Sequence, residues 1–340
     1  MRTGRALREA ALRLRSMTAG DLRYWYGPVP SRRLGKSLGI NNIPAKVCTY
    51  SCVYCQVGRT SRRQNDRCFF HRPEDIFRDV KSGLAKAKEA AEQVDYLTFV
   101  PDGEPTLDVN LGREIMLLKA LAVPVGVITN GSLVSRDDVR EDLGKADWVS
   151  LKIDAVRESI WRRINRPHKT IRLSLVLEGM LAFAKTFAGR LVTETMLVKG
   201  INDHGDRLKE VADFIHELRP SRAYISVPLR PPAERWVLAP DEAVLNRAYQ
   251  VLADKLGRVE FLIGYEGDDF AFTGDIEKDL LGITAVHPMR EDAVNNMLSR
   301  AGSSWDVIVR LVSQGDLTET KYGGHTFYLR RFTQDGEATE

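Results

Sequence analysis

Three cysteines stand within eight residues, at Cys48, Cys52 and Cys55, in the pattern CxxxCxxC. Three thiolates on one short loop can bind three irons of a cubane 4Fe-4S cluster and leave the fourth iron open to another ligand. A structural zinc ion normally has four Cys or His ligands in two paired groups, and the sequence has no second CxxC. The spacing therefore favours an iron-sulfur cluster over the alternative, a zinc site completed by Cys68 and His71.

A second group of polar residues follows apolar runs further along the chain. Asp102-Gly103-Glu104-Pro105 comes after one such run, Asn130 after the next, and Ser150 and Asp154 belong to the one after that. A glycine allows a ligand to approach the backbone closely, and Glu104 offers a carboxylate to an ammonium group. The alternative for each of these residues is a turn or a surface polar group.

Two charged residues occupy later strand positions. Glu194 interrupts the apolar run Leu-Val-Thr-Glu-Thr-Met-Leu-Val, so its carboxylate must be exposed, paired or bound to a ligand, and we favour the ligand. Arg230 precedes Pro231-Pro232 and could reach an anionic group of a substrate. A surface arginine before a rigid turn is the alternative.

Short β-branched runs alternate with helical patterns between these residues. Strands are predicted at 37–44, 95–100, 123–130, 147–154, 191–198 and 223–229, and helices at 74–94, 111–121, 171–187, 206–218 and 241–256. The run at 259–264 is a candidate edge strand. Such alternation predicts an α/β fold with a parallel sheet, here a partial (β/α)6 TIM-like barrel, whose functional loops lie at the carboxyl ends of the strands.

A different pattern begins near residue 271. It predicts a helix at 275–282, an extended segment at 285–288, helices at 291–301 (from Glu291) and 303–314 (capped by Ser303), and strands at 317–321 and 326–331. This order is typical of a small winged-helix domain. The helix at 303–314 is mostly apolar with a thin basic face, which favours a packing or protein-contact role over DNA binding.

An aromatic residue, Tyr54, precedes the third cysteine, and the strand-end residues follow in order along residues 25–265. In these features the chain resembles the radical S-adenosylmethionine (radical SAM) enzymes. The resemblance implies one 4Fe-4S cluster on the three cysteines, with S-adenosylmethionine (SAM) chelated to the open iron. In that family the reduced cluster cleaves SAM to a 5′-deoxyadenosyl radical, which abstracts a hydrogen atom from the substrate.

The same resemblance assigns roles to the other polar residues. It implies that the cofactor is contacted by Tyr54, Gly103, Glu104, Pro105, Asn130, Ser150, Asp154 and Glu194, and it leaves Arg230 as a candidate substrate contact. It also implies a low-potential electron donor of the flavodoxin or ferredoxin type.

Finer similarity points to a branch grouped with the wyosine-forming tRNA enzymes. It rests on residues 26–35, on 55–60, on 164–168 and on 230–232. Those enzymes carry a second cluster on three additional cysteines, and only Cys68 remains here outside the motif. One cluster is therefore expected, and tRNA or nucleotide modification is the first hypothesis for the substrate.

The composition is that of an ordinary globular chain, with a formal charge of +4 over 340 residues and 43% hydrophobic residues. We expect a basic arm at 1–22, the barrel at 23–270, the winged helix at 271–333 and a tail at 334–340. The loop at 56–72 holds five arginines and one aspartate, which favours an anionic small molecule or RNA as substrate. Without a spanning segment or signal peptide, the expected compartment is the cytoplasm, with no membrane partner.

Two functions from different classes fit these observations. The first is a radical SAM enzyme acting on an anionic substrate. The alternative is a redox-sensing DNA-binding regulator, in which an iron-sulfur cluster controls the winged helix. A regulator needs no cofactor pocket, so Gly103, Glu104 and Glu194 favour the enzyme.

Overall fold

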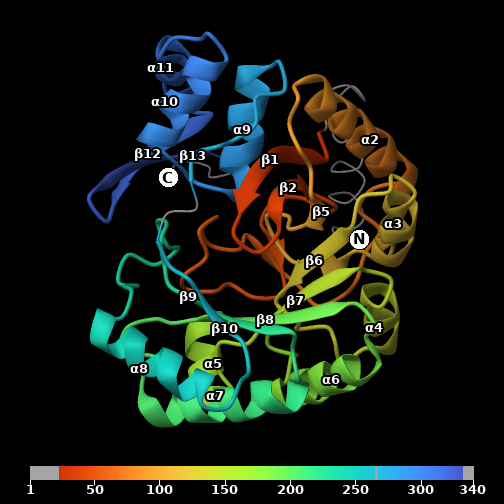
Figure 1. Ribbon diagram of the computed structural model, residues 1–340, viewed down its shortest axis with the longest axis vertical. Coiled ribbons are helices and arrows are strands. Elements are labelled where there is room, and N and C mark those ends of the chain that lie inside the picture. The colour runs from red at the N-terminus through yellow and green to blue at the C-terminus, as the bar shows by residue number, and fades with distance from the viewer. Residues whose placement is uncertain (1–22, 265–266, 332–340) are drawn as a thin grey trace, which may run out of the picture.

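The computed structural model describes residues 23–264 and 267–331, and its largest feature is a curled eight-stranded sheet (Figure 1). The strand order is β1-β2-β5-β6-β7-β8-β9-β10, with β1 antiparallel to β2 and every other neighbouring pair parallel. The strands are β1 Trp25–Ser31, β2 Gly35–Ile40, β5 Tyr96–Phe99, β6 Val125–Thr129, β7 Trp148–Lys152, β8 Arg190–Met196, β9 Arg222–Ser226 and β10 Val259–Leu262. The predicted α/β partial barrel is confirmed, including the edge strand β10.

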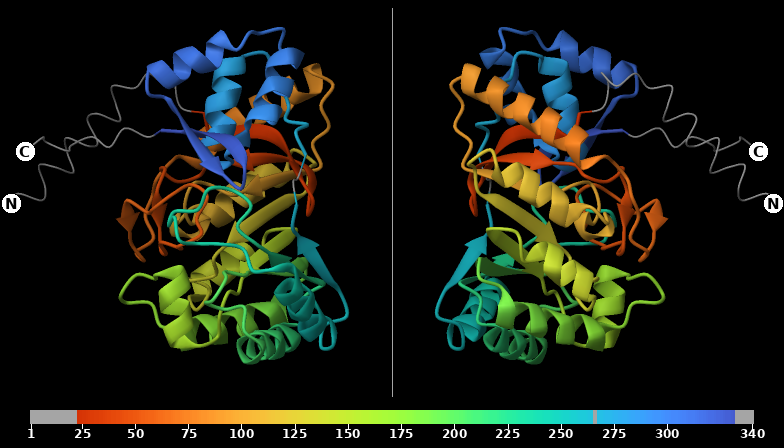
Figure 2. Two further views of the ribbon diagram at one scale, coloured as in Figure 1. Left: turned by 90° about the vertical axis from the view of Figure 1, so that its left-hand side faces the viewer. Right: turned by 90° about the vertical axis from the view of Figure 1, so that its right-hand side faces the viewer.

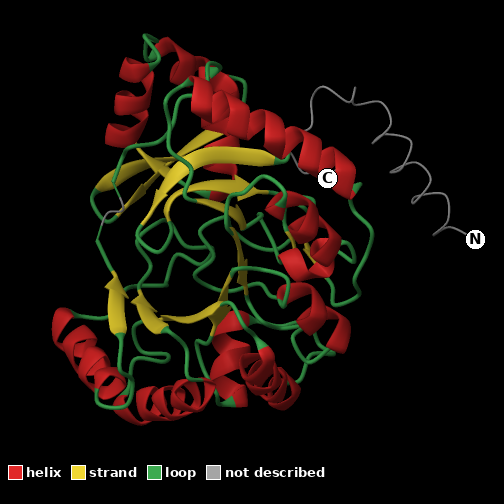
Figure 3. Ribbon diagram, turned by 45° about the vertical axis from the view of Figure 1, so that its right-hand side comes forward, coloured by secondary structure: helices red, strands yellow, loops and turns green. Residues whose placement is uncertain are grey.

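Helices cover the outer face of the sheet and leave its concave face to loops (Figure 3). In α2 the buried residues Ile76, Val80 and Ala87 recur at helical spacing and form the inward stripe. Two helices, α4 and α5, and the strand β1 were not predicted from the sequence. The helices are α2 Pro73–Glu89, α3 Leu111–Lys119, α4 Asp137–Leu143, α5 Glu158–Asn165, α6 Leu173–Thr186, α7 Gly205–Leu218 and α8 Glu242–Ala253.

Short elements shape the loops at the carboxyl ends of the strands. A two-residue ladder joins β3 (Val47–Cys48) to β4 (Arg62–Arg63), and a 3-10 turn, η1, spans Pro105–Leu107. An isolated bridge between Val47 and Gly103 brings the cysteine loop against the loop after β5. Two sequence motifs that are far apart in the chain are thereby fixed side by side.

The residues after 275 form a compact unit, here called the C-terminal module (residues 276–330). It comprises α9 Ile276–Val286, β11 Met289–Arg290, α10 Glu291–Arg300, α11 Asp306–Ser313, β12 Leu317–Tyr322 and β13 His325–Arg330, with the sheet order β11-β13-β12. Its assignment as a winged helix, like the predicted domain boundaries, stays a prediction.

Two local expectations in the module were wrong. Ala285 and Val286 were predicted to be extended, but they form the last turn of α9, because their apolar side chains are buried in the module core. Ser303 was predicted to cap the following helix, but α11 begins at Asp306 with Trp305 at the N-cap position. Predicted segments that fall at 1–22 and 332–340 lie outside the described residues.

The module packs against the first strands of the sheet (Figure 2). Tyr26 and Val29 of β1 belong to the same hydrophobic cluster as Phe270, Leu280 and Ile283, whereas most of the barrel core forms a separate cluster. Within the described ranges, none of the helices has the length and apolar character needed to cross a membrane.

Candidate functional site

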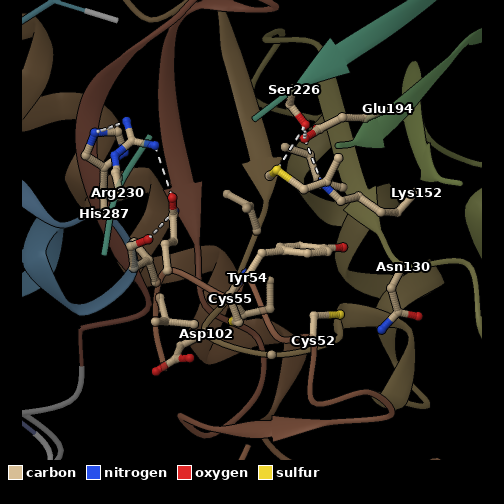
Figure 4. Close-up of a pocket in the computed structure, with 18 of the residues that line it drawn as sticks. Cys52, Tyr54, Cys55, Asp102, Asn130, Lys152, Glu194, Ser226, Arg230 and His287 are labelled. Atoms are coloured by element: carbon tan, nitrogen blue, oxygen red, sulfur yellow. Dashed lines mark hydrogen bonds and ion pairs between the residues drawn. The ribbon is translucent and has the colours of Figure 1, made fainter. Parts of the chain in front are cut away.

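The loops at the carboxyl ends of the strands enclose a cavity of about 350 Å³ (Figure 4). Its lining includes the three motif cysteines and residues from β1, β2, β5, β6, β7, β8 and β9, together with the end of α9. A cavity at this edge of a parallel sheet is where ligands bind in α/β folds.

All three motif cysteines line this cavity as free, half-buried thiols. The side-chain amide of Asn130 lies 3.6 Å from the sulfur of Cys48, and that of Asn165 lies 3.5 Å from the sulfur of Cys52. Burial raises the pKa of each thiol, that of Cys52 to about 12. Soft sulfur donors in a poorly solvated cavity suit ligation to iron, whose positive charge would stabilise the thiolate form.

The structure does not assemble the alternative zinc site. Cys68 does not line the cavity, and its sulfur instead lies 3.5 Å from the side-chain amide of Gln64. His71 packs edge-on against Tyr24, with the ring centroids 4.8 Å apart. Across the described ranges, no three Cys, His, Asp or Glu side chains, the three motif cysteines included, are already grouped closely enough to hold a metal ion.

The loop after β5 reaches the cavity through Asp102, Gly103 and Glu104. A Cβ atom on Gly103 would lie only 2.0 Å from the carbonyl oxygen of Val47, so a glycine is required for this close backbone approach. Burial raises the pKa of Asp102 to about 6, and within the described part of the chain neither of its carboxylate oxygens accepts a hydrogen bond of ordinary geometry. Its ion pair with Lys46 spans 3.5 Å.

Glu104 is engaged within its own neighbourhood. Its carboxylate accepts hydrogen bonds from the backbone and hydroxyl of Thr106, at 3.1 and 2.6 Å, and from the hydroxyl of Thr129 at 2.6 Å. A fourth bond comes from the backbone N–H of Asn130 at 2.9 Å. Glu104 therefore fixes the ends of β5 and β6 relative to each other, a structural role in addition to any contact with a ligand.

The predicted cofactor contacts separate into two groups. Besides the cysteines, the cavity is lined by Tyr54, Gly103, Glu104, Asn130 and Glu194, and by the candidate substrate contact Arg230. Pro105, Ser150 and Asp154 are buried beside it and are not part of its lining. Asp154 accepts hydrogen bonds from the hydroxyl of Tyr54 and, at 2.7 Å, from the amide of Asn165, so it positions the aromatic ring that does line the cavity.

Glu194 is paired, which changes the interpretation made from sequence. Its carboxylate forms an ion pair with Arg33 and another with Lys152 at 2.7 Å, and it accepts a hydrogen bond from Ser226 at 2.8 Å. Burial alone would raise its pKa, but Lys152 and Arg33 hold that pKa well below the ordinary carboxyl range. Burial of Glu194 therefore requires no ligand.

Several cavity residues were missed from sequence. Arg33, Lys46 and Lys152 lie on its walls, and so do Gln56 and His287, the latter from the C-terminal module. Arg33 and Gln56 stand in two of the segments that carry the finer resemblance, 26–35 and 55–60, but neither was given a role, and Lys46, Lys152 and His287 stand in none of these segments. Only the fold brings these residues together, so no local sequence pattern could have identified them.

The arginines of the loop at 56–72 differ in their exposure and in their partners. Arg62 and Arg63 are exposed, as a loop beside an anionic ligand would require. Arg67 is only 4% exposed and is paired with Asp138 and Asp142, so it ties the loop to α4. The predicted positive potential therefore comes from only part of this loop.

The geometry of the cavity, the thiols and the strand-end polar groups is that of a cofactor-dependent α/β enzyme. Comparison with known proteins identifies the family to which the chain belongs. The sequence profile described as the Radical SAM superfamily matches residues 42–218. The chain is also 45% identical over 307 residues to the "UPF0026 protein MJ1312" of Methanocaldococcus jannaschii, covering 90% of this chain and 95% of that protein.

Two further matches are more distant. An "S-adenosylmethionine-dependent nucleotide dehydratase" of Flammeovirga pacifica is 28% identical over 161 residues, which cover 43% of this chain and 53% of that protein. The solved structure of Streptococcus suis SuiB bound to S-adenosylmethionine matches with a TM-score of 0.50 at 14% identity, covering 66% of this chain and 50% of that one. The second likeness shows the fold.

The chain therefore belongs to the radical SAM superfamily and, within it, to the UPF0026 family. It is an enzyme, and its cofactors are the 4Fe-4S cluster and SAM that define the superfamily.

Proposed function

We propose that this enzyme holds its 4Fe-4S cluster on Cys48, Cys52 and Cys55 and uses it to functionalise an anionic substrate, with a nucleotide or tRNA as the first candidate. The observation that carries the proposal is the convergence of three free thiols on one cavity. When bound, the cluster and SAM together supply a 5′-deoxyadenosyl radical that abstracts a hydrogen atom from the substrate. The protein provides binding, orientation and exclusion of water.

Two side-chain amides that contact the thiols support this ligand assignment. The amides of Asn130 and Asn165 point at two of the three sulfurs, and N–H groups near a ligating thiolate stabilise its negative charge. Asn130 is itself fixed, because its side-chain amide also donates to the hydroxyl of Thr49 at 2.8 Å. We infer that these amides tune the cluster as well as position its ligands.

The loop after β5 suits the positively charged end of SAM. Asp102 is buried, and its oxygens have no hydrogen-bond partner among the described residues. Its long ion pair with Lys46, at 3.5 Å, compensates this buried carboxylate only in part, and a ligand ammonium group could add the hydrogen bonds that its oxygens lack. Gly103 allows that group to reach the backbone, and Tyr54, Glu104 and Asn130 complete this side of the cavity.

The charge of the cavity supports an anionic substrate. Its lining contains five basic residues against three acidic ones, namely Arg32, Arg33, Lys46, Lys152 and Arg230 against Asp102, Glu104 and Glu194. A cavity with this balance attracts anions. Exposed Arg62 and Arg63 extend the positive charge onto the surrounding surface, as a polynucleotide would require. A nucleotide is also what one relative's name assigns to that protein.

A DNA-binding regulator receives less support. The helix expected to read DNA, α11, pairs its Arg310 with Glu277 of α9. It exposes apolar side chains instead, with Val309 57% exposed. A low-potential electron donor of the flavodoxin or ferredoxin type remains part of the proposal as the enzyme's protein partner.

A single anaerobic preparation tests whether the protein cleaves SAM. Protein reconstituted anaerobically, then given dithionite and SAM, should release 5′-deoxyadenosine, and Cys68→Ala protein should do so equally. Absence of 5′-deoxyadenosine from protein with a full cluster would contradict the proposal. The substrate class is tested by comparing nucleotides and tRNA nucleosides between deletion and parent strains, where an unchanged tRNA and nucleotide profile would remove the first candidate.

A further inference from the structure

The backbone of the cysteine loop is bonded to two segments of the chain that carry many cations. The backbone N–H of Gln64 donates to the carbonyl of Cys48 at 3.1 Å, and that of His168 donates to the carbonyl of Thr49 at 2.8 Å. These bonds place both segments directly against the loop that carries the thiols. The two segments are residues 59–66 and 166–170.

The two segments also contact each other. The guanidinium of Arg63 donates to the carbonyl of Arg166 at 3.1 Å, and the side-chain amide of Asn65 donates to the hydroxyl of Thr170 at 2.6 Å. They therefore form one continuous surface beside the cysteine loop, here called the basic surface (residues 59–66 and 166–170).

Cations outnumber carboxylates on the basic surface. Five cations stand against a single carboxylate, Asp66, within its two segments. Glu234, from the loop after β9, pairs with two of the five and neutralises one charge. Arg62 and Lys169 are exposed and have no ion-pair partner within the described part of the chain. The surface therefore keeps a net positive charge. The five cations are Arg59, Arg62, Arg63, Arg166 and Lys169.

A short distance separates the basic surface from one of the thiol-bearing residues. In the ladder of β3 and β4, Cys48 is paired with Arg63, and neighbouring strands of a ladder lie about 4.8 Å apart. The ladder lies at the edge of the molecule (Figure 2). A partner that covers β4 therefore comes within about one strand spacing of the backbone of Cys48, a proposed cluster ligand.

The five cations of the basic surface are not part of the cavity lining. A substrate must enter the cavity, whereas an electron donor has only to bring its own cofactor close to the cluster. The cluster needs one electron before it can cleave SAM. The position of the basic surface therefore suits the donor better than the substrate.

We propose that the basic surface is the docking site of an acidic, low-potential electron-carrier protein, which reduces the cluster across the β3–β4 ladder. The carrier loses one electron, the oxidised cluster gains it, and no atom is transferred. Positive charge on the enzyme steers an acidic carrier toward this face and orients it, in the small and transient kind of interface that electron carriers form. The inference rests on the proposed function, since it takes Cys48 as a cluster ligand.

Titration calorimetry at low ionic strength, on the full-length, cluster-loaded protein under anaerobic conditions, tests the docking site. The probes are a bacterial flavodoxin and a bacterial ferredoxin, titrated separately. Binding of at least one probe is expected, and Arg62→Glu/Lys169→Glu should weaken it about tenfold or more, because each substitution replaces an attraction with a repulsion. Added salt should weaken binding to the unaltered protein more than binding to this variant.

The rate of SAM cleavage separates docking from chemistry. With the reduced carrier as donor, below saturation, the Arg62→Glu/Lys169→Glu variant should release 5′-deoxyadenosine about tenfold more slowly than the unaltered protein. Dithionite is a small reductant that needs no docking surface. With dithionite, and with no substrate added, the two proteins should release 5′-deoxyadenosine at equal rates.

The matched control is Lys86→Glu/Lys88→Glu, which reverses two exposed charges in the last turn of the 17-residue helix α2 and should leave the affinity for the carrier unchanged. Cluster absorbance and thermal unfolding are recorded for every variant. If the variant at 62 and 169 does not fold, Arg62→Ala/Lys169→Ala replaces it, with a smaller loss of affinity expected. No binding of either carrier to the unaltered protein, or an equal loss in the control, would overturn the proposal.

RNA is the alternative occupant, since a polynucleotide would also be attracted to Arg62. Binding of unmodified tRNA is therefore measured for the same variants. If Arg62→Glu/Lys169→Glu weakened tRNA binding and left the affinity for both carriers unchanged, the surface would be assigned to RNA and the proposal overturned.

Carrier binding is measured without SAM, so this inference and the function on which it rests can fail separately. Release of 5′-deoxyadenosine with dithionite, together with carrier binding that ignores the Arg62→Glu/Lys169→Glu variant, would remove the docking site and leave the enzyme. Carrier binding that responds to the variant, in protein that has a full cluster and releases no 5′-deoxyadenosine, would remove the proposed reaction and leave the docking site.

Discussion

The two sides of the cavity satisfy their polar groups in different ways. On the cluster side, comprising the cysteine loop, residues 102–105 and Asn130, Glu104 is held by hydroxyl and backbone donors from adjacent strand ends. On the far side, comprising Arg33, Lys152, Glu194, Arg230 and His287, long side chains from separate elements meet as charges or charged donors. The cluster side therefore depends on local backbone geometry, and the far side depends on electrostatics.

The largest effect is expected on the cluster side. Cys48→Ala, Cys52→Ala or Cys55→Ala should each remove most of the 4Fe-4S absorbance and leave the fold intact, because each substitution keeps the loop residues Tyr50, Val53 and Tyr54 in the barrel core. Anaerobic absorbance spectra and circular dichroism measure the two properties. Cys68→Ala is the control, and an equal loss of cluster in that variant would show that the ligand assignment is wrong.

The next largest effect is expected on the far side. Glu194→Gln leaves Arg33 and Lys152 partly buried without their shared counter-charge, which should lower the free energy of unfolding by about 3–5 kcal/mol. Urea unfolding at neutral pH measures this loss. Glu210→Gln, which breaks an exposed pair with Arg157, should change stability far less. If the two variants were equally stable, the far side would not depend on electrostatics in the way described here.

The pH dependence of this pair has a definite sign. The pKa of Glu194 is lowered in the folded protein, so its stabilising contribution is present above the ordinary carboxyl pKa. That contribution is lost as the pH falls below the ordinary range. Unfolding measured from neutral to acid pH should therefore show a smaller loss of stability in Glu194→Gln than in the unaltered protein.

A smaller effect is expected at the glycine of the cluster side. Gly103→Ala places a methyl group 2.0 Å from the backbone oxygen of Val47, where no flexible side chain can yield. Overpacking of this kind costs about 1–3 kcal/mol in unfolding free energy. Gly205→Ala is the matched control, because nothing lies within 4 Å of its added methyl group. If Gly103→Ala were as stable as the control, the close backbone approach would not matter.

The smallest effect is expected for a buried pair of carboxyl groups, Glu114 and Asp108. Burial, followed by mutual repulsion, raises the pKa of Glu114, which lies beside Asp108 and accepts a hydrogen bond from Asn42 at 3.1 Å. A raised carboxyl pKa means that this contribution to stability is present below the ordinary pKa and is lost as the pH rises toward the raised value. Glu114→Gln should therefore gain about 1–2 kcal/mol at pH 8 relative to pH 5. If Glu114→Gln changed the free energy of unfolding equally at pH 5 and pH 8, the raised pKa of Glu114 would be contradicted.

Sequence reasoning recovered the cluster side better than the far side for a physical reason. Cys48, Gly103 and Asn130 each lie at or after the end of a strand, so the rule that strand ends meet at one edge was enough to bring them together. Lys152 was passed over because only its strand partner, Glu194, gives it a role.

The module shows the same limit. The order of its strands and helices could be predicted from patterning, but the contact between His287 and Arg230 depends on how the module packs against the barrel. Packing between distant segments leaves no periodic signal in the chain. The ion pairs of Glu194 were not predicted for that reason, since its cationic partner Arg33 lies on the turn between β1 and β2.

The place of Tyr26 has a consequence for how the chain unfolds. Its ring sits over Gly39, where a Cβ would lie 2.0 Å from the ring, its hydroxyl donates to the carbonyl of Val100 at 3.0 Å, and it shares a hydrophobic cluster with the module. The strand β1 is thus part of both the barrel and the C-terminal module. Unfolding of either one would therefore expose apolar surface of the other to water. Heating should accordingly give a single calorimetric transition, with equal calorimetric and van't Hoff enthalpies.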